Sequence, residues 1–188
     1  MARRRLLITL AVIAPILGLL AFGFQRDPRF INSPLLAKEA APFVLTLFDG
    51  SKITLSDLRG KAVFLNFWAS WCPPCRAEAK DLEAAWQRIK DKNMVFIGIA
   101  LQDTDAESRA FIQEFNVSYP NGRDDSGKIA VDYGVWGIPE SFFIDPQGRI
   151  TYKHVGGISA ERVIVKLEEA KLGVVSAKEG RGDYQSIR

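Results

Sequence analysis

The sequence predicts a single α/β domain in which helices flank a central mixed β-sheet, preceded by one transmembrane helix. Two apolar runs, Ala62–Trp68 and 94–101, have the length and composition of strands buried on both faces. Apolar residues at helical spacing lie between them, which favours a parallel strand–helix–strand unit. Segments 141–144 and 149–155 flank Pro146-Gln147-Gly148 and indicate an antiparallel hairpin in the same sheet. A chain of 188 residues, 47% of them apolar, is long enough for one such domain.

The charge balance and the cysteine count exclude several classes of protein. The chain has 25 Lys+Arg against 22 Asp+Glu, and Arg3, Arg4 and Arg5 supply the whole excess. The rest of the chain is therefore neutral and lacks the basic surplus that nucleic-acid binding needs. Two cysteines are too few for a scaffold held together by disulfides.

The N-terminus predicts a membrane anchor. Residues 6–24 carry no charge, and as a helix they would span roughly 28 Å, close to the ~30 Å hydrocarbon core of a bilayer. This stretch is longer than the apolar part of a cleavable signal peptide, and Ala21-Phe22-Gly23 matches a cleavage site poorly. We therefore expect an uncleaved single-pass helix in the cytoplasmic (inner) membrane. The three arginines predict a cytoplasmic N-terminus and a periplasmic, extracytoplasmic domain.

The rest of the chain divides by composition and by turn signals. We expect a basic start at 1–5, the anchor at 6–24, a proline-containing tether at 25–42, the folded domain at 43–172 and a flexible tail at 173–188. At the start of the domain we expect a hairpin at 43–48 and 53–55 and a helical turn at 56–60. Four helices are expected further along the chain: a long one after the cysteines, one opened by a capping box from Thr104 to Glu107, a short one at 127–133 and a last one that starts at Ser159.

The two cysteines form a C-x-x-C motif, Trp71-Cys72-Pro73-Pro74-Cys75, where a strand turns into a helix. In open α/β sheets, chemistry collects beyond the carboxyl ends of the strands. At the start of a helix, unpaired N–H groups and the dipole stabilise a thiolate and lower its pKa below the free value of about 8.5. Cys72 is therefore the predicted nucleophile and Cys75 the resolving thiol. Pro73 and Pro74 fit the first turn, where N–H groups have no intrahelical partner.

Other uses of the two cysteines are less consistent with the sequence. A structural disulfide that closes so short a loop would stabilise the fold weakly. Zinc needs four ligands, whereas the chain offers two thiols and one imidazole, His154. Two thiolates and His154 could hold copper, so a copper chaperone stays an alternative from a different class. No metal, flavin or nucleotide cofactor is predicted.

Two sets of motifs resemble known families. The string WCPPC after Phe64-Leu65-Asn66-Phe67-Trp68, with Gly137-Ile138-Pro139-Glu140 later, resembles the thioredoxin superfamily over about 42–172. A second resemblance is to the membrane-anchored thiol:disulfide interchange proteins of cytochrome c maturation, the DsbE type. It rests on four strings: Arg26-Asp27-Pro28 and Ser33-Pro34-Leu35 after the anchor, GIPESFFID from Gly137, and Tyr152-Lys153-His154.

The resemblance implies a thioredoxin-like fold with an N-terminal β-hairpin extension. It also implies a cis peptide bond at Ile138-Pro139 facing the cysteine pair, with the backbone of Ile138 open to an extended substrate. The substrate-binding residues would be Trp71, Pro73, Pro74, Ile138 and Pro139.

The implied activity is protein-disulfide reduction by thiol:disulfide exchange through Cys72 and Cys75. The implied partners are apocytochrome c or a haem-handling maturation factor as substrate, and a membrane thiol transporter as electron donor. A disulfide oxidase or isomerase stays open, because the sequence does not give the reduction potential.

The sequence departs from two patterns of the superfamily. Asn66 stands where cytoplasmic thioredoxins carry a buried Asp, so another group must act as acid and base for Cys75. Glu78 lies at i+3 from Cys75 on one helical face, and Glu140 follows Pro139; both stay open, with Glu78 slightly favoured. Peroxidases of the superfamily carry Pro and Thr where Leu65 and Ala69 stand here, which argues against peroxide reduction.

Overall fold

A computed structural model describes residues 3–4, 11–19, 33–90 and 92–187, and it divides into two units, Met1–Asn32 and Ser33–Arg188. In the first unit residues 11–19 are helical. Over the described ranges, no helix combines the length and the apolar character needed to cross a membrane. The predicted anchor at 6–24 extends past the described residues at both of its ends.

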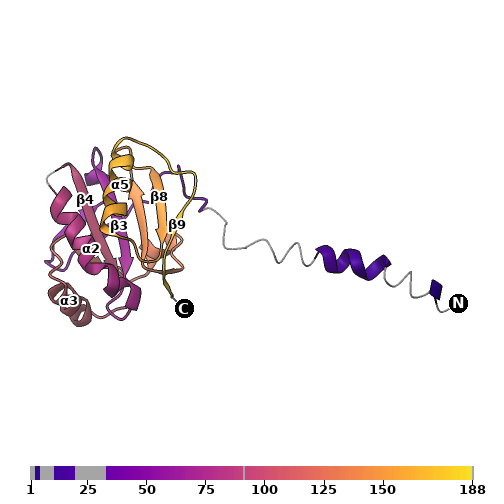
Figure 1. Cartoon of the computed structure of the whole chain (residues 1–188). Helices are drawn as coiled ribbons and strands as arrows, with labels where there is room; N and C mark the ends of the chain where they lie inside the picture. The colour runs from indigo at the N-terminus through magenta and orange to yellow at the C-terminus, as the bar shows by residue number, and fades with distance from the viewer. Residues whose placement is uncertain (1–2, 5–10, 20–32, 91, 188) are drawn as a thin grey trace. The chain divides into compact units, whose positions relative to one another are not determined.

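The second unit is built on a mixed sheet flanked by helices, as predicted (Figure 1). The sheet has six strands. The strand order is β5-β4-β3-β7-β8-β9. The bounds are β3 Ala62–Trp68, β4 Met94–Ala100, β5 Asn121–Arg123, β7 Glu140–Ile144, β8 Ile150–Val155 and β9 Gly180–Arg181. Strands β3, β4 and β5 run parallel, whereas β7 is antiparallel to both β3 and β8. Strand β3, one of the two strands predicted to be buried on both faces, lies between β4 and β7.

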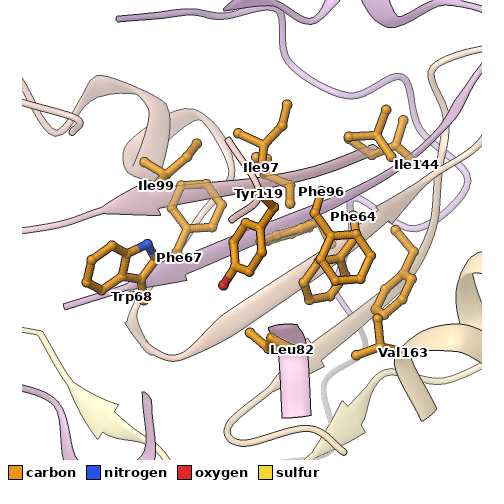
Figure 2. Packing of buried hydrophobic residues seen from close by; sticks show 14 of the residues in the cluster. Phe64, Phe67, Trp68, Leu82, Phe96, Ile97, Ile99, Tyr119, Ile144 and Val163 are labelled. Atoms are coloured by element: carbon orange, nitrogen blue, oxygen red, sulfur yellow. The ribbon is translucent and has the colours of Figure 1, made fainter. Parts of the chain in front are cut away.

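The core fills both faces of this sheet because β3 and β4 are apolar on both faces. Figure 2 shows Phe64 and Phe96 on the side of the sheet that faces Leu82 and Val163. The rings of Phe64 and Phe96 lie 4.6 Å apart, centroid to centroid. On the other face, Phe67 packs 5.7 Å from the ring of Tyr133.

Helices cover the sheet as the apolar spacing predicts. The helices are α2 Pro73–Ile89, α3 Asp105–Glu114, α4 Lys128–Asp132 and α5 Ala160–Lys171, with a 3-10 turn at Ser56–Leu58. Helices α2 and α5 contact each other and lie side by side over one face (Figure 1). The hairpin β1 Val44–Thr46 and β2 Lys52–Thr54 forms the predicted N-terminal extension.

Thr104 is the N-cap of α3, as predicted, but one hydrogen bond of the expected capping box is replaced by another. The Thr104 hydroxyl accepts from the N–H of Glu107 at 3.1 Å and donates to the Glu107 carboxylate at 2.7 Å. The N–H of Thr104, which a full capping box would give to Glu107, donates instead to Asp103 Oδ1 at 3.0 Å.

The domain begins earlier than predicted, because part of the expected tether packs on it. The N–H of Ala37 donates to the carbonyl of Ile150 at 2.8 Å, and Ala40 is buried. The tether prediction over 25–32 lies outside the described residues.

The C-terminal segment also pairs with the domain, where the sequence favoured a flexible tail. Strand β9 runs parallel to β8, and β10 Gln185–Ser186 pairs antiparallel with β6 Gly137–Ile138. Neither β6 nor β5 was predicted.

Candidate active site

The cysteine pair lies just past the carboxyl end of β3, at the start of α2. Cys72 and Cys75 form a disulfide with their Cα atoms 5.3 Å apart. Cys72 is the N-cap of α2, and Pro73 and Pro74 form the first turn, as predicted. Both cysteines are buried. The structure therefore brings the two predicted redox residues into one disulfide.

The contacts of the Cys72 sulfur suit the attacking thiol. Its Sγ accepts a hydrogen bond from the N–H of Cys75 at 3.3 Å. A backbone donor and the N-terminal end of a 17-residue helix both favour negative charge on this sulfur after reduction. The carbonyl oxygen of Ile138 lies 3.6 Å from the same Sγ, and the Ile138-Pro139 peptide bond is cis. The cis peptide bond implied by the resemblance is thus present, and the backbone of Ile138 adjoins the cysteine pair.

The loop that carries Trp71 is fixed by the loop after β4. The indole N–H of Trp71 donates to the carbonyl of Gln102 at 2.9 Å, while the side chain stays 44% exposed. Asp103 accepts from the N–H of Ser70 at 2.8 Å and from its hydroxyl at 2.9 Å. Asp103 therefore positions the turn before the cysteines. Sequence reasoning missed it, because an Asp just before a helix N-cap has no distinguishing pattern.

Glu78 is a buried carboxyl on the inner face of α2, the same face that buries Cys75. Its Oε1 accepts from Asn66 Nδ2 at 3.1 Å, and its Oε2 accepts from the N–H of Ile158 at 2.9 Å. Asn66 also donates to the Ser141 hydroxyl at 3.1 Å. Burial raises the pKa of Glu78 to about 8, because its two hydrogen-bond partners, Asn66 and the N–H of Ile158, are neutral and offset the loss of hydration only in part. Glu78 can therefore exchange a proton near neutral pH.

Glu140 lies in a different environment, although it is equally buried. Its Oε1 accepts from the N–H groups of Trp136 at 3.0 Å and Gly137 at 3.1 Å, just before the cis-proline. Its Oε2 pairs with the ammonium of Lys153 at 2.7 Å, and that lysine is itself buried. Burial raises the pKa of Glu140, and the charge of Lys153 opposes this effect. These contacts make Glu140 and Lys153 positioning residues for the segment that adjoins Cys72.

Lys153 was part of a motif in the sequence without a role of its own. Its place on β8 puts it opposite Phe142 on β7, and its ammonium also lies 5.1 Å from the Phe142 ring. The only sequence signal for its role is its position, because Lys153 lies inside a strand whose other residues are buried.

His154 has both ring nitrogens engaged within the domain. Its Nε2 lies 3.1 Å from the carbonyl oxygen of Gly157, which requires an N–H there, and its Nδ1 then accepts from the Tyr152 hydroxyl at 3.2 Å. Burial lowers the pKa of His154 to about 4. Among residues 33–90 and 92–187, as in the described N-terminal ranges, no group of three His, Cys, Asp or Glu side chains could hold a metal ion. The structure thus does not combine His154 with the cysteines into a ligand set.

Comparison with known proteins agrees with this site. Residues 36–153 match the AhpC/TSA family. The chain is 33% identical to the thiol-disulfide oxidoreductase ResA of Bacillus thuringiensis, over 87% of this chain and 95% of that protein. It is 38% identical to the thiol:disulfide interchange protein DsbE of Allochromatium vinosum, over 84% of this chain and 87% of that one.

Solved structures give the same result. A crystal structure from Chlorobium tepidum, provisionally assigned as a thiol:disulfide interchange protein DsbE, superposes with a TM-score of 0.67 and 29% identity. The match covers 72% of this chain and 96% of that one. With its Cys72–Cys75 disulfide, this chain belongs to the AhpC/TSA family of the thioredoxin fold, as a thiol-disulfide oxidoreductase of the ResA and DsbE type.

Proposed function

We propose that this oxidoreductase works as a protein-disulfide reductase on the outer face of the cytoplasmic membrane, where it keeps the haem-binding cysteines of apocytochrome c reduced. The observation that carries the proposal is the Cys72–Cys75 disulfide at the start of α2, with Cys72 Sγ beside the backbone of Ile138. Its similarity to proteins named DsbE and ResA supports the proposal. The location rests on Arg3, Arg4 and Arg5 before the uncharged stretch at 6–24.

The reaction is two successive thiol–disulfide exchanges. The Cys72 thiolate attacks one sulfur of the substrate disulfide, and the other substrate sulfur leaves and takes up a proton. The Cys75 thiolate then attacks Cys72 Sγ, so that the first substrate sulfur also leaves as a thiol. Two electrons and two protons pass to the substrate, and Cys72–Cys75 ends as the disulfide. A membrane thiol transporter must then reduce this disulfide, since no soluble thiol pool is assured outside the cytoplasm.

Glu78 is the group we assign to proton transfer with Cys75. A buried thiol must lose its proton before it can attack, and a carboxyl with a pKa of about 8 is matched to that transfer near neutral pH. The carboxylate of Glu140 is instead bonded to Lys153 and to two backbone N–H groups, so it is poorly placed to give up or accept a proton.

The decisive test measures the direction in which the protein exchanges electrons with a peptide substrate. The full-length protein in detergent should be equilibrated with thioredoxin and glutathione buffers, and then mixed with an oxidised peptide that carries a C-x-x-C-H haem-attachment motif. We expect a potential near the reducing end of the roughly −270 to −120 mV range and stoichiometric reduction of the peptide. A potential near the upper end, with net oxidation of a dithiol peptide, would identify a disulfide oxidase instead.

A second arm of the same test distinguishes the proposed reductase from a copper chaperone. His154→Gln keeps a polar side chain at a position where both ring nitrogens have partners within the domain. Reduction of the peptide should persist in this variant, whereas a copper role would appear as Cu(I) binding that the variant loses.

A further inference from the structure

The C-terminal residues 180–187 lie along the strand that adjoins the cysteine pair. In the pairing of β10 with β6, Gln185 is opposite Ile138, and Ser186 is opposite Gly137. Ile138 is the residue whose carbonyl oxygen lies 3.6 Å from Cys72 Sγ. The edge of β6 beside the reactive sulfur is therefore already occupied by the chain's own C-terminal segment.

Backbone hydrogen bonds attach this segment at its central glycine, Gly182, and at the next residue, Asp183. The N–H of Gly182 donates to the carbonyl of Val155 at 2.7 Å, and the N–H of Gly157 donates to the carbonyl of Asp183 at 2.8 Å. A Cβ at residue 182 would overlap the backbone oxygen of Gly157. The close approach of the two backbones thus requires a glycine at 182.

An aromatic contact holds the same segment at its other end. The ring of Tyr184 meets that of Trp136 nearly at right angles, with centroids 4.7 Å apart. The N–H of Ile187 then reaches the carbonyl of Trp136 at 3.4 Å. Trp136 is the residue whose own N–H is bonded to Glu140, so the segment rests on the part of the loop that the buried carboxylate positions.

A protein substrate needs this same edge. Its sulfur must come within a bond length, about 2.05 Å, of Cys72 Sγ in the mixed disulfide. An extended chain next to that sulfur meets the N–H and C=O groups of β6, which are a template for strand pairing. The substrate and residues 180–187 therefore compete for one position.

We propose that residues 180–187 are an internal occupant of the substrate edge, which an extended protein segment must displace before Cys72 can attack its disulfide. The proposal deepens the proposed function by naming the substrate as an extended segment. Tyr184 packs on Trp136 and directly precedes Gln185, the residue opposite Ile138. A substrate residue in the equivalent position would replace Tyr184 on the Trp136 ring, which favours an aromatic side chain there.

The test uses Gly182→Val in the full-length protein, with Lys178→Val as the matched control. Valine at 182 would overlap the backbone of Gly157, whereas Lys178 is exposed and precedes the paired strands. In the parent, the Gly157 amide should be protected from hydrogen exchange by its bond to Asp183. In Gly182→Val it should exchange rapidly, and the control should match the parent.

Accessibility of the site gives the functional readout. Because binding depends on the fraction of molecules with the edge open, the reduced Gly182→Val protein should react with iodoacetamide at least about threefold faster, and its KM for a protein disulfide should fall by a similar factor. Its kcat should stay unchanged, since the substituted residue touches no reacting atom. A synthetic peptide with the sequence of residues 180–187 should restore slow alkylation, and a scrambled peptide should not.

A second variant makes the outcome decisive. Tyr184→Ala removes only the ring contact and should give a smaller change in the same direction, which guards against misfolding of the valine variant. Equal exchange, alkylation and KM in the parent and both variants would overturn the proposal and leave the reductase intact. Failure of every chain to reduce protein disulfides, with exchange and alkylation still responding to Gly182→Val, would instead overturn the proposed function.

Discussion

Two buried carboxyls near the cysteine pair differ in what neutralises them, and this difference assigns their roles. Glu78 has an amide and a backbone N–H as partners, so its charged form is uncompensated. Glu140 has Lys153 at 2.7 Å. A carboxyl without a cation keeps its proton to higher pH and can transfer it, whereas a paired one holds its charge and fixes the groups bonded to it.

Glu78 should make the stability of the fold depend on pH. Its pKa is about 8 in the folded protein against 4.5 for the free side chain, so between these values the folded state binds more protons than the unfolded state. The free energy of unfolding should therefore fall as pH rises through this window, by up to about 1.4 kcal/mol for each unit of pKa difference. Glu78→Gln should flatten this slope, measured by urea denaturation between pH 5 and 9.

The kinetic counterpart is tested in the same variant. Glu78→Gln should slow the release of substrate from a preformed mixed disulfide, with a loss of up to about 10²-fold near neutral pH, because a positioned acid–base group typically contributes that much or more. Lys80→Gln, which removes a charge on the exposed side of α2, is the control. A parental rate across the whole pH range would exclude Glu78 from proton transfer.

Removal of one cysteine at a time should show which thiol forms the mixed disulfide with substrate. Cys75→Ser leaves the Cys72 thiolate at the helix start and blocks the second exchange, so mixed disulfides with substrate should accumulate. Cys72→Ser should accumulate almost none, since Cys75 lies inside the first turn. Non-reducing gels after acid quenching measure both. Equal accumulation in the two variants would contradict the assignment of Cys72 as nucleophile.

At the scale of elements, the sequence predicted those whose own residues determine them. Strands β3 and β4 were correctly placed because unbroken apolar runs are buried wherever they pack. Strand β5 was missed because Asn121-Gly122-Arg123 is typical of a turn. Its pairing depends on Gly98, where a side chain would overlap Asn121, and on the bond from Trp68 Nε1 to Asn121 Oδ1 at 3.0 Å. Such contacts between distant segments are not visible in local sequence.

The pair that joins β7 to β8 gives a prediction at this scale. Lys153→Met would leave the Glu140 carboxylate buried without its cation, which should cost about 3–5 kcal/mol in the free energy of unfolding. Glu140→Gln with Lys153→Met should recover part of this loss, because no unpaired charge then stays inside. A double-mutant cycle from denaturant midpoints measures the coupling. Additive losses would show that the pair does not act as a unit.

At the scale of the whole molecule, the site is assembled from segments far apart in the chain. The motif WCPPC and the GIPE string were recognisable because each lies within a few residues. Asp103, Lys153 and the C-terminal residues 180–187 join the site only through the pairing of strands, which places β4 beside β3, β8 beside β7 and β10 beside β6. Sequence alone therefore indicated the chemistry of the site but not the groups that position it or the segment that occupies its edge.

The N-terminus gives the last prediction, which concerns topology. Arg3, Arg4 and Arg5 precede an uncharged stretch, and positive residues flanking such a stretch stay on the cytoplasmic side. A reporter that is active only outside the cytoplasm, fused after Arg188, should therefore be active, and the protein should stay with the membrane fraction in high salt. Replacing the three arginines with glutamates should reduce the reporter signal several-fold, whereas the same change at Arg26 and Arg29, beyond the stretch, should not. A shortened protein released into the soluble fraction would show instead that the segment is a cleaved signal peptide, because an anchor that spans the bilayer keeps the domain attached.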